Sequence, residues 1–205
     1  VFELKKSDVG KKVDERLKEF SSFKNKGSEE WFAELCFCLL TANSKASTAI
    51  KIHDKLGFKG FSELSEEKVA EVIRSVGHRF HNNKAKYIVL ARDYIDIKWI
   101  LSGIIHEEGS FGAREWIVEN VKGLGYKEAS HYLRNIGFTD IAVLDRHILN
   151  LMVENGYLKV KPKTLSRKKY LEVEGVFKEI AIDAKMNCAE LDLYMWYLKA
   201  GEVLR

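Results

Sequence analysis

Cysteine is scarce in this 205-residue sequence, and its three copies are poorly placed for chemistry. Cys36 and Cys38 lie inside WFAELCFCLL, where a spacing of two residues on a helix points them in different directions. Because their number is odd and their surroundings are apolar, we expect buried thiols rather than disulfides or metal ligands. With Cys188 as the third, the chain cannot supply a four-cysteine iron–sulfur cluster. The pattern favours a reducing, cytoplasmic location.

Other absences narrow the class of protein further. Proline occurs once, at Pro162, and glutamine is missing, while lysine and glutamate are abundant, which is compatible with a thermophilic source. No run of about 18 apolar residues could span a membrane, and the first residues lack the apolar core of a signal peptide. The composition predicts a soluble, globular, intracellular protein.

The numbers of basic and acidic residues are nearly equal. The 34 basic and 30 acidic residues leave a formal net charge of +4, so most charges are expected to form an ordinary solvated surface. A small positive surplus suits a nucleic-acid partner when it is concentrated on one face. The basic interval KVKPKTLSRKK at 159–169 is either a solvated loop or a segment that also touches a phosphate backbone.

Apolar residues recur mostly with helical spacing, which predicts an all-α fold. The IAVL segment at 141–144 is too short to argue for a sheet. SEEWFAELCFCLLTAN is apolar nearly all round, so it is expected to be the central buried helix, with Ser28 as its N-cap. No clean linker divides residues 1–205. Helices are predicted at 13–23, 28–43, 65–77, 83–95, 111–120, 126–136, 146–155, 167–183 and 189–200.

The segment VKGLGYKEASHYLRNIG interrupts the helical pattern with Gly123 and Gly125. These glycines allow a tight turn between two helices, which together occupy approximately residues 111–136. The turn ends where the second helix begins, and the free N–H groups there bind a phosphate without reading the bases. The segment therefore suits a helix–hairpin–helix DNA-binding element, although glycines so spaced also mark any short turn between helices.

Two charged residues follow the turn. Lys127 lies in the first turn of the second helix, where the helix dipole disfavours a cation and makes a neutral, nucleophilic amine more available. Asp145 precedes RHILNLM and is typical of a helix N-cap, which would hold a carboxylate rigidly. The alternatives are an exposed surface lysine and a purely structural cap.

Together the hairpin, the lysine and an aspartate eighteen positions later resemble the signature of the helix–hairpin–helix DNA glycosylase superfamily. KGLGYKEASHYLRNIG, LDRHIL, CFCLLTAN, GHRFHNNKAKYIVLAR and LDLYMWYLKAGEVL are similar to the archaeal-type 8-oxoguanine DNA glycosylases. The resemblance implies two helical subdomains of one glycosylase unit with the DNA cleft between them. It also implies a monomer that removes 8-oxoguanine and then nicks the abasic strand, without a metal or redox cofactor.

The resemblance also implies roles for individual residues. Lys127 would form a Schiff base with the sugar, and Asp145 would stabilise positive charge on the sugar and orient the lysine. Backbone carbonyls around Val121 and Leu124 are suited to hold a monovalent cation. The residues expected to contact DNA are Lys122, Gly123, Gly125, His147 and Asn43, and those expected to form the base pocket are Phe80, Trp196 and Arg205.

Purely structural interpretations remain open for several of these residues. His147 could instead be an exposed first-turn histidine, and Asn43 could simply end a helix. Lys122 could be a solvated lysine, and Trp196 could be a core residue.

Other candidate functions are a glycosylase for oxidised pyrimidines, alkylated purines or mismatches, and a non-catalytic DNA-binding or scaffolding module. The missing cysteine cluster counts against the iron–sulfur branch, and Lys127 counts against monofunctional branches. Duplex DNA containing 8-oxoguanine or abasic sites is the expected partner, with no membrane.

Overall fold

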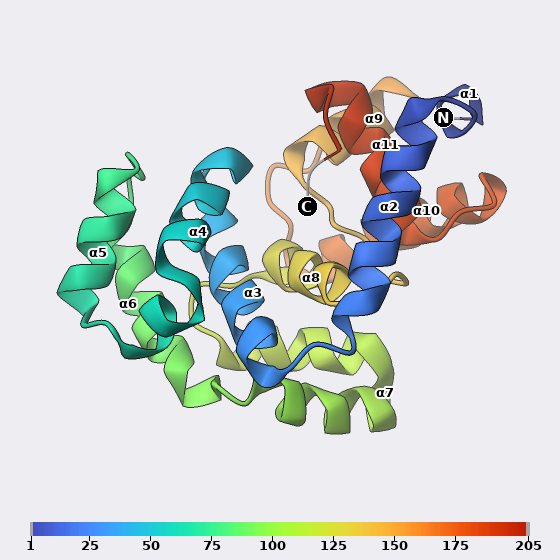
Figure 1. Ribbon diagram of the computed structural model, residues 1–205. Helices are drawn as coiled ribbons and strands as arrows, with labels where there is room; N and C mark the ends of the chain where they lie inside the picture. The colour runs from blue at the N-terminus through green and yellow to red at the C-terminus, as the bar shows by residue number, and fades with distance from the viewer. Residues whose placement is uncertain (1, 204–205) are drawn as a thin grey trace. The chain divides into compact units, whose positions relative to one another are not determined.

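The computed structural model describes residues 2–203 and, within them, contains only helices and their connections (Figure 1). The predicted all-α fold is confirmed. The elements are α1 (Phe2–Lys5), α2 (Asp8–Phe23), α3 (Ser28–Thr41), α4 (Ala46–Glu63), α5 (Glu66–Ser75), α6 (His81–Ala91), the 3-10 helix η1 (Arg92–Tyr94), α7 (Ile97–Asn120), α8 (Tyr126–Asn135), α9 (Arg146–Glu154), α10 (Arg167–Asp183) and α11 (Cys188–Ala200).

The chain divides into two compact units that are not continuous in sequence. Unit 1 combines Val1–Lys24 with Leu133–Arg205, and unit 2 is the intervening Asn25–Tyr132. The boundary at residue 132 falls inside α8, so this helix belongs to both units. Each unit has its own buried apolar residues.

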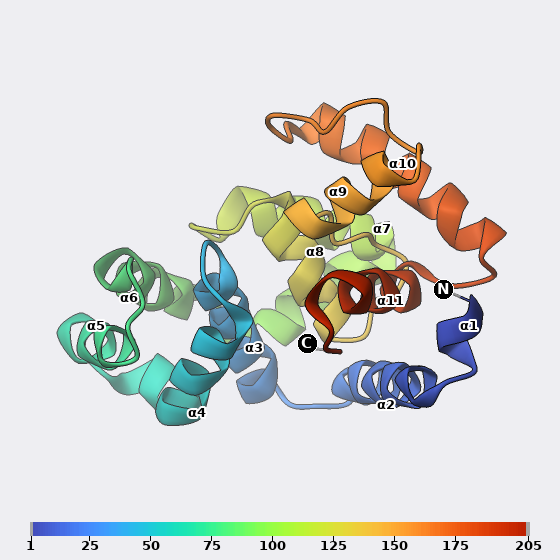
Figure 2. The ribbon, with the colours of Figure 1, turned by 90° about the horizontal axis from the view of Figure 1, so that it is seen from above.

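In unit 2, α3 is the central helix and packs against α4, α6 and α7 (Figure 2). Every residue from Trp31 to Thr41 is buried, as the apolar sequence predicts. Cys36 and Cys38 are fully buried free thiols, and burial raises the pKa of Cys36 well above its ordinary value. The expectation of Ser28 as the N-cap was wrong. Gly27 caps α3, because Ser28 already has helical geometry and forms the first turn with Glu29 and Glu30.

Besides the short α1, two helical stretches were not predicted, α4 and the first half of α7. Each contains a glycine with a positive φ angle, Gly57 at 56° in α4 and Gly109 at 71° in α7. A left-handed residue breaks the helix, so each element consists of two short pieces whose apolar periodicity restarts at the glycine. A single periodic pattern therefore does not run through either segment.

In unit 1, α11 packs against α2, α9 and α10. Arg134 and Asp192 form a buried ion pair beneath α11, and the Arg134 guanidinium also binds Asn135 Oδ1 and lies 5.0 Å from the Phe20 ring. These contacts satisfy charges that would otherwise be costly to bury.

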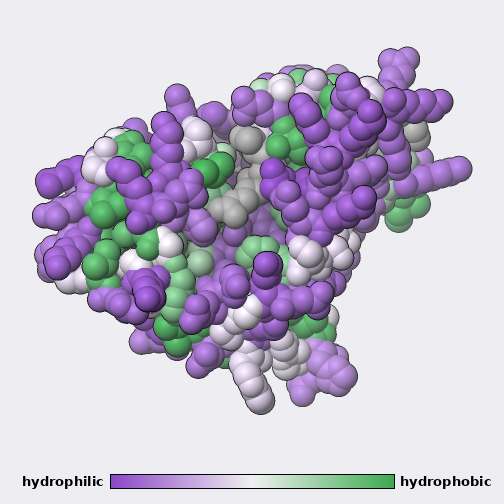
Figure 3. Space-filling model, viewed as in Figure 1, coloured by the Kyte–Doolittle hydropathy of each residue, from purple (hydrophilic) through white to green (hydrophobic). Residues whose placement is uncertain are grey.

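Hydrophilic side chains cover most of the molecular face shown in Figure 3. Over the described residues, no helix combines the length and the apolar character that a membrane span requires.

Candidate active site

The glycine turn connects α7 to α8 through a compact loop in unit 2. Val121 is the C-cap of α7, and its carbonyl accepts a hydrogen bond from Leu124 N at 3.2 Å. Gly125 O accepts the first helical bond, from Ala129 N at 2.9 Å. Gly123 has a φ of 97°, and a Cβ there would lie 2.9 Å from Cε2 and Cγ of Tyr87. Glycine is therefore required at 123 by both backbone angle and space, whereas a Cβ at Gly125 meets only Glu128 Oε2, at 3.6 Å.

A buried arginine joins the two helices on either side of this turn. Arg114 on α7 is fully buried and donates to Ser130 Oγ on α8 at 3.2 Å. Its guanidinium lies 5.6 Å from the Tyr126 ring, and the Tyr126 hydroxyl donates to Glu115 on α7. These polar contacts fix the start of α8 against α7, and the sequence reading did not single them out.

Lys127 lies in the first turn of α8, as the sequence predicts. Its side chain is 29% exposed, so the amine is accessible without being free in solvent. The ammonium pairs with Glu128 Oε1 at 3.3 Å. Lys122 is exposed in the turn itself. The phosphate-binding features expected of the hairpin and the candidate nucleophile are thus within a few residues of each other.

A second, buried lysine lies in the same unit. Lys84 on α6 is 5% exposed, and its Nζ donates to Leu39 O near the end of α3 at 2.5 Å. Burial lowers the pKa of Lys84 to about 8, while the Glu128 charge raises it and the Lys127 charge lowers it. Lys84 is therefore coupled electrostatically to the candidate nucleophile.

The loop after α3 carries Asn43, which is exposed and has a left-handed backbone at a φ of 60°. Asparagine tolerates this conformation better than most residues.

The ring of buried His78 contacts both the end of α3 and Phe80. Its Nε2 lies 3.2 Å from Leu40 O, and its Nδ1 accepts a hydrogen bond from Phe80 N at 3.1 Å. Since Nδ1 is an acceptor, the ring is neutral, and burial correspondingly lowers the pKa of His78. Phe80 is half-buried beneath the Arg79 guanidinium, 4.4 Å away.

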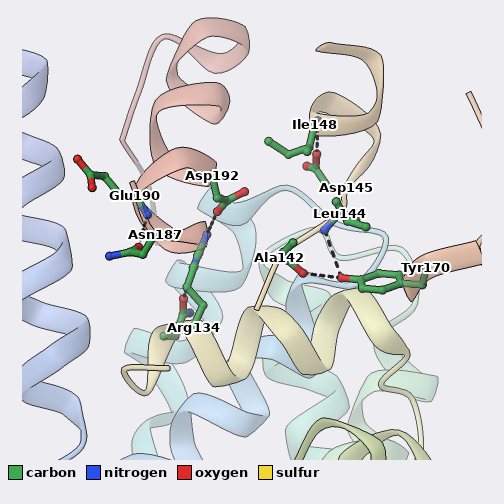
Figure 4. Close-up of polar contacts among 10 residues, drawn as sticks. Arg134, Ala142, Leu144, Asp145, Ile148, Tyr170, Asn187, Glu190 and Asp192 are labelled. Atoms are coloured by element: carbon green, nitrogen blue, oxygen red, sulfur yellow. Dashed lines mark hydrogen bonds and ion pairs between the residues drawn. The ribbon is translucent and has the colours of Figure 1, made fainter. Parts of the chain in front are cut away.

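Asp145 in unit 1 is the N-cap of α9, as predicted. Its Oδ1 accepts from His147 N at 2.8 Å. It also accepts from Ile148 N at 2.9 Å (Figure 4). Both bonds reach the same oxygen, so within the described part of unit 1 no hydrogen bond is made to Oδ2. The cap therefore fixes the position of the carboxylate and uses only Oδ1, which leaves Oδ2 available to other partners.

The buried IAVL segment, residues 141–144, directly precedes Asp145. It has no regular secondary structure, and side chains of α10 form hydrogen bonds with its backbone. The Tyr170 hydroxyl donates to Ala142 O at 2.8 Å and accepts from Leu144 N at 3.3 Å (Figure 4), and Ala142 N donates to Glu174 Oε1 at 2.9 Å. This fixed, buried approach determines where the carboxylate lies.

His147 and Trp196 lie together in unit 1. Their rings meet edge to face with centroids 5.0 Å apart, and Arg146 Nε donates to His147 Nε2 at 3.3 Å. Trp196 is half-buried, and its indole Nε1 is a buried donor that finds no acceptor among the described residues. The Trp196 ring is thus partly exposed, although its indole N–H is buried. Arg205 lies outside the described residues.

The predicted site residues thus form two groups. Unit 2 holds Asn43, Phe80, Lys122, Gly123, Gly125 and Lys127, and unit 1 holds Asp145, His147 and Trp196. Sequence reasoning missed His78, Lys84 and Glu128. Lys84 had one detectable signal, because it shares a helix face with Ile88 and Ala91, both buried.

Comparison with known proteins assigns the chain to a family. The family model Ogg-HhH, described as 8-oxoguanine DNA glycosylase, matches residues 13–186. An 8-oxoguanine DNA glycosylase/AP lyase of Methanocaldococcus jannaschii is 50% identical over 99% of this chain and 96% of its own length. One of Korarchaeum cryptofilum is 45% identical over 100% and 96%.

A solved structure extends this similarity to the fold. The M. jannaschii 8-oxoguanine glycosylase/lyase in complex with a 15mer DNA containing 8-oxoguanine has a TM-score of 0.96 at 49% identity, covering 100% of this chain and 97% of that chain. The matched part of this chain spans the residues of both units. The chain therefore belongs to the Ogg-HhH family of 8-oxoguanine DNA glycosylases.

Proposed function

We propose that this protein is a bifunctional enzyme of DNA base-excision repair that removes 8-oxoguanine and then cleaves the strand at the abasic site. The observation that carries the proposal is a partly exposed lysine in the first turn of α8, directly after a glycine turn that exposes backbone N–H groups. Family membership supports it, since the similar proteins are named 8-oxoguanine DNA glycosylase/AP lyase.

Base removal starts with the neutral amine of Lys127. A base inside a duplex cannot be reached, so the damaged nucleotide first turns out of the helix. Lys127 Nζ then forms a bond to C1′ of the sugar, and the bond between C1′ and N9 of the base breaks with its electron pair leaving on the base. The base takes up a proton, and the amine loses one. Asp145 stabilises the positive charge that develops on the sugar.

Strand cleavage follows from the same covalent bond. Opening of the sugar ring gives a Schiff base between Lys127 and C1′. The iminium withdraws electrons, so a proton is lost from C2′ and the C3′–O bond breaks in a β-elimination. The products are a nick 3′ to the lesion and, after hydrolysis, the free enzyme. Both steps use only side chains and water.

The remaining residues bind the DNA rather than react with it. Backbone N–H groups of the turn around Gly123 and Gly125, with Lys122 and His147, bind phosphates. Asn43 faces the base left unpaired by flipping, and its left-handed backbone sets the direction of that side chain. Carbonyls of Val121 and Leu124 hold a monovalent cation at the turn.

The lesion base stacks on Trp196, and the partial exposure of this side chain supports that role. Phe80 is assigned either to the lesion base or to the stack that the flipped base leaves. The active species is a single chain acting on chromosomal DNA inside the cell, with residues 1–205 as one glycosylase and its helix–hairpin–helix at approximately 111–136.

One incubation tests the proposal against its rivals. Parent protein is mixed separately with duplexes that carry 8-oxoguanine, uracil, thymine glycol or an abasic site. Nicking of the 8-oxoguanine and abasic duplexes, with the other two left intact, is the expected result. Preferential cleavage of thymine glycol or uracil would instead identify another glycosylase, and binding without cleavage of any duplex would identify a non-catalytic module.

A further inference from the structure

The last turn of α3 is bound by side chains from a distant part of the sequence. Lys84, which is buried on α6, donates from Nζ to Leu39 O at 2.5 Å. The buried ring of His78 donates from Nε2 to Leu40 O at 3.2 Å. The last carbonyls of a helix have no partner within the helix, so a buried helix end needs such donors from elsewhere. Two side chains from residues 78–84 therefore fix the C-terminal end of α3.

This helix end leads directly into Asn43. The Thr41 hydroxyl donates to Cys38 O at 2.9 Å, and Thr41 O accepts from Ser44 N at 3.1 Å, which closes a turn around Asn43. Asn43 has a φ of 60° within this turn, so the direction of its side chain follows from the position of the preceding helix end. A shift of the last turn of α3 would therefore displace the Asn43 side chain.

The ring of His78 also binds the backbone at Phe80. Its Nδ1 accepts a hydrogen bond from Phe80 N at 3.1 Å, so one neutral imidazole joins Leu40 O to Phe80 N. The two rings also meet, with centroids 6.5 Å apart. A substitution at His78 that tests the contact with α3 alone must therefore keep an acceptor for Phe80 N.

We propose that His78 and Lys84 are positioning residues that act through Asn43, so that excision depends on them when a base lies opposite the lesion. The inference rests on the proposed function, in which Asn43 faces the base left unpaired by flipping. That contact stabilises the flipped complex only while the end of α3 stays in place. His78 and Lys84 are themselves buried, so we expect neither side chain to touch the DNA.

The test compares two duplexes that differ only opposite the lesion. In one duplex, 8-oxoguanine lies opposite cytosine, and in the other it lies opposite a tetrahydrofuran residue, which has a sugar but no base. Single-turnover excision rates are measured on both duplexes. Asn43→Gly removes the side chain and keeps a residue that adopts a positive φ freely, so it shows how much of the rate depends on Asn43.

Two variants each remove one donor to the end of α3. His78→Asn loses the donor to Leu40 O and keeps an acceptor near the position of Nδ1. Lys84→Met keeps an apolar stem and loses the donor to Leu39 O. Because small displacements of positioned groups are costly, each should slow excision about tenfold opposite cytosine and less than about twofold opposite tetrahydrofuran. Adding Asn43→Gly to either variant should cause little further loss, because the same contact is already lost.

Arg92→Met serves as the matched control. Arg92 binds the end of α4 in a similar way, with Nε donating to Phe61 O at 2.8 Å and Nη2 to Leu64 O at 2.5 Å. Losing these bonds should lower stability, as in the other variants. The ratio of the two excision rates should stay at the parent value, because the end of α4 carries no proposed site residue. Urea denaturation establishes that each variant is folded under the assay conditions.

The outcomes separate the inference from the function on which it rests. Loss opposite cytosine alone in each folded variant, without further loss on adding Asn43→Gly, supports the inference. Equal losses on both duplexes, parent rates on both, losses that add to that of Asn43→Gly, or the same change of ratio in Arg92→Met overturn it. If one variant does not fold, the other decides the outcome.

The parent protein and Asn43→Gly test the level below. Excision opposite cytosine at the parent rate by Asn43→Gly would remove the proposed role of Asn43, and the inference would fail with it. Failure of the parent to excise 8-oxoguanine from either duplex would instead overturn the proposed function itself.

Discussion

At the scale of single residues, Asp145 is the N-cap of α9, and its catalytic role is a proposal. One oxygen caps α9, and the cap directs the carboxylate. An asparagine has the same shape and caps a helix equally well, but it carries no charge. The two roles can therefore be separated by substitution.

Asp145→Asn is expected to keep the free energy of unfolding within a few tenths of a kcal/mol and to slow 8-oxoguanine excision by about a hundredfold or more. Asp145→Ala should lose about 1 kcal/mol of stability in addition. Urea denaturation and single-turnover excision measure the two effects. Ser166→Ala, which removes the equivalent cap of α10, controls for stability loss alone. Full activity in folded Asp145→Asn would leave the residue only its structural role.

Trp196 is predicted to stack on the flipped base. Base–aromatic stacking is worth roughly 1–3 kcal/mol by alanine substitution, so Trp196→Ala should slow 8-oxoguanine excision about tenfold to a hundredfold. Nicking of a preformed abasic site should be largely unaffected, since no base is bound there. Trp99→Ala removes a tryptophan that is 83% exposed and serves as the matched control. Equal loss of both activities would mean that Trp196 acts by packing the core.

The sequence was most informative where chemistry follows local spacing. The positions of Lys127 in a first helical turn and of Asp145 as an N-cap were predicted correctly because each leaves a local signal, whereas their catalytic roles were inferred from the resemblance and stay predictions. Lys84 and His78 were missed because their partners are the carbonyls of Leu39 and Leu40, 45 and 38 residues away along the chain. No local pattern shows that a lysine will be buried against a distant helix end.

At the scale of elements, the turn between α7 and α8 depends on Gly123 for two independent reasons. The left-handed backbone disfavours any side chain by about 1–2 kcal/mol, and Tyr87 occupies the space that a Cβ would need. An alanine there would therefore distort the turn or displace Tyr87.

Gly123→Ala is expected to weaken binding to undamaged duplex DNA about tenfold, because the strained turn no longer aims its N–H groups at a phosphate. Fluorescence anisotropy with a labelled duplex measures the affinity. Gly125→Ala is the comparison, since a Cβ at 125 makes only an ordinary contact and should weaken binding much less. Equal affinities for the parent and a folded Gly123→Ala would exclude the turn from the DNA interface.

Helix prediction succeeded where one apolar face runs without interruption. The predicted 167–183 coincides with α10, and 146–155 exceeds α9 by one residue. Prediction failed for α4 and the first half of α7, where Gly57 and Gly109 adopt positive φ angles. A glycine in a helical pattern is compatible with both a continuous and a broken helix, so packing decides between them.

At the scale of the whole molecule, the division into units could not be read from composition. Unit 1 takes its residues from both ends of the chain, and one boundary falls within α8. Linker-like sequence is therefore missing at the boundary, since a continuous helix crosses it. The division depends on which helices pack together.

The net charge of +4 is small, so DNA affinity should depend on a limited number of local phosphate contacts. Binding to undamaged duplex should weaken steeply with salt, with each neutralised phosphate contributing about 0.9 to the slope of log K against log salt. Lys122→Ala should reduce that slope by about one, whereas Lys11→Ala, on an exposed lysine paired with Asp8 on α2, should not. An affinity that is independent of salt would contradict phosphate binding.

The central claim is that Lys127 is the nucleophile of an 8-oxoguanine DNA glycosylase. It is tested most directly by borohydride trapping on a duplex containing 8-oxoguanine, followed by proteolysis and mass spectrometry to locate the DNA adduct. The account predicts a covalent complex with the DNA on Lys127, and none when Lys127→Gln is used under the same conditions. Trapping of Lys127→Gln at the parent yield, or an adduct located on Lys84 or Lys122, would contradict it.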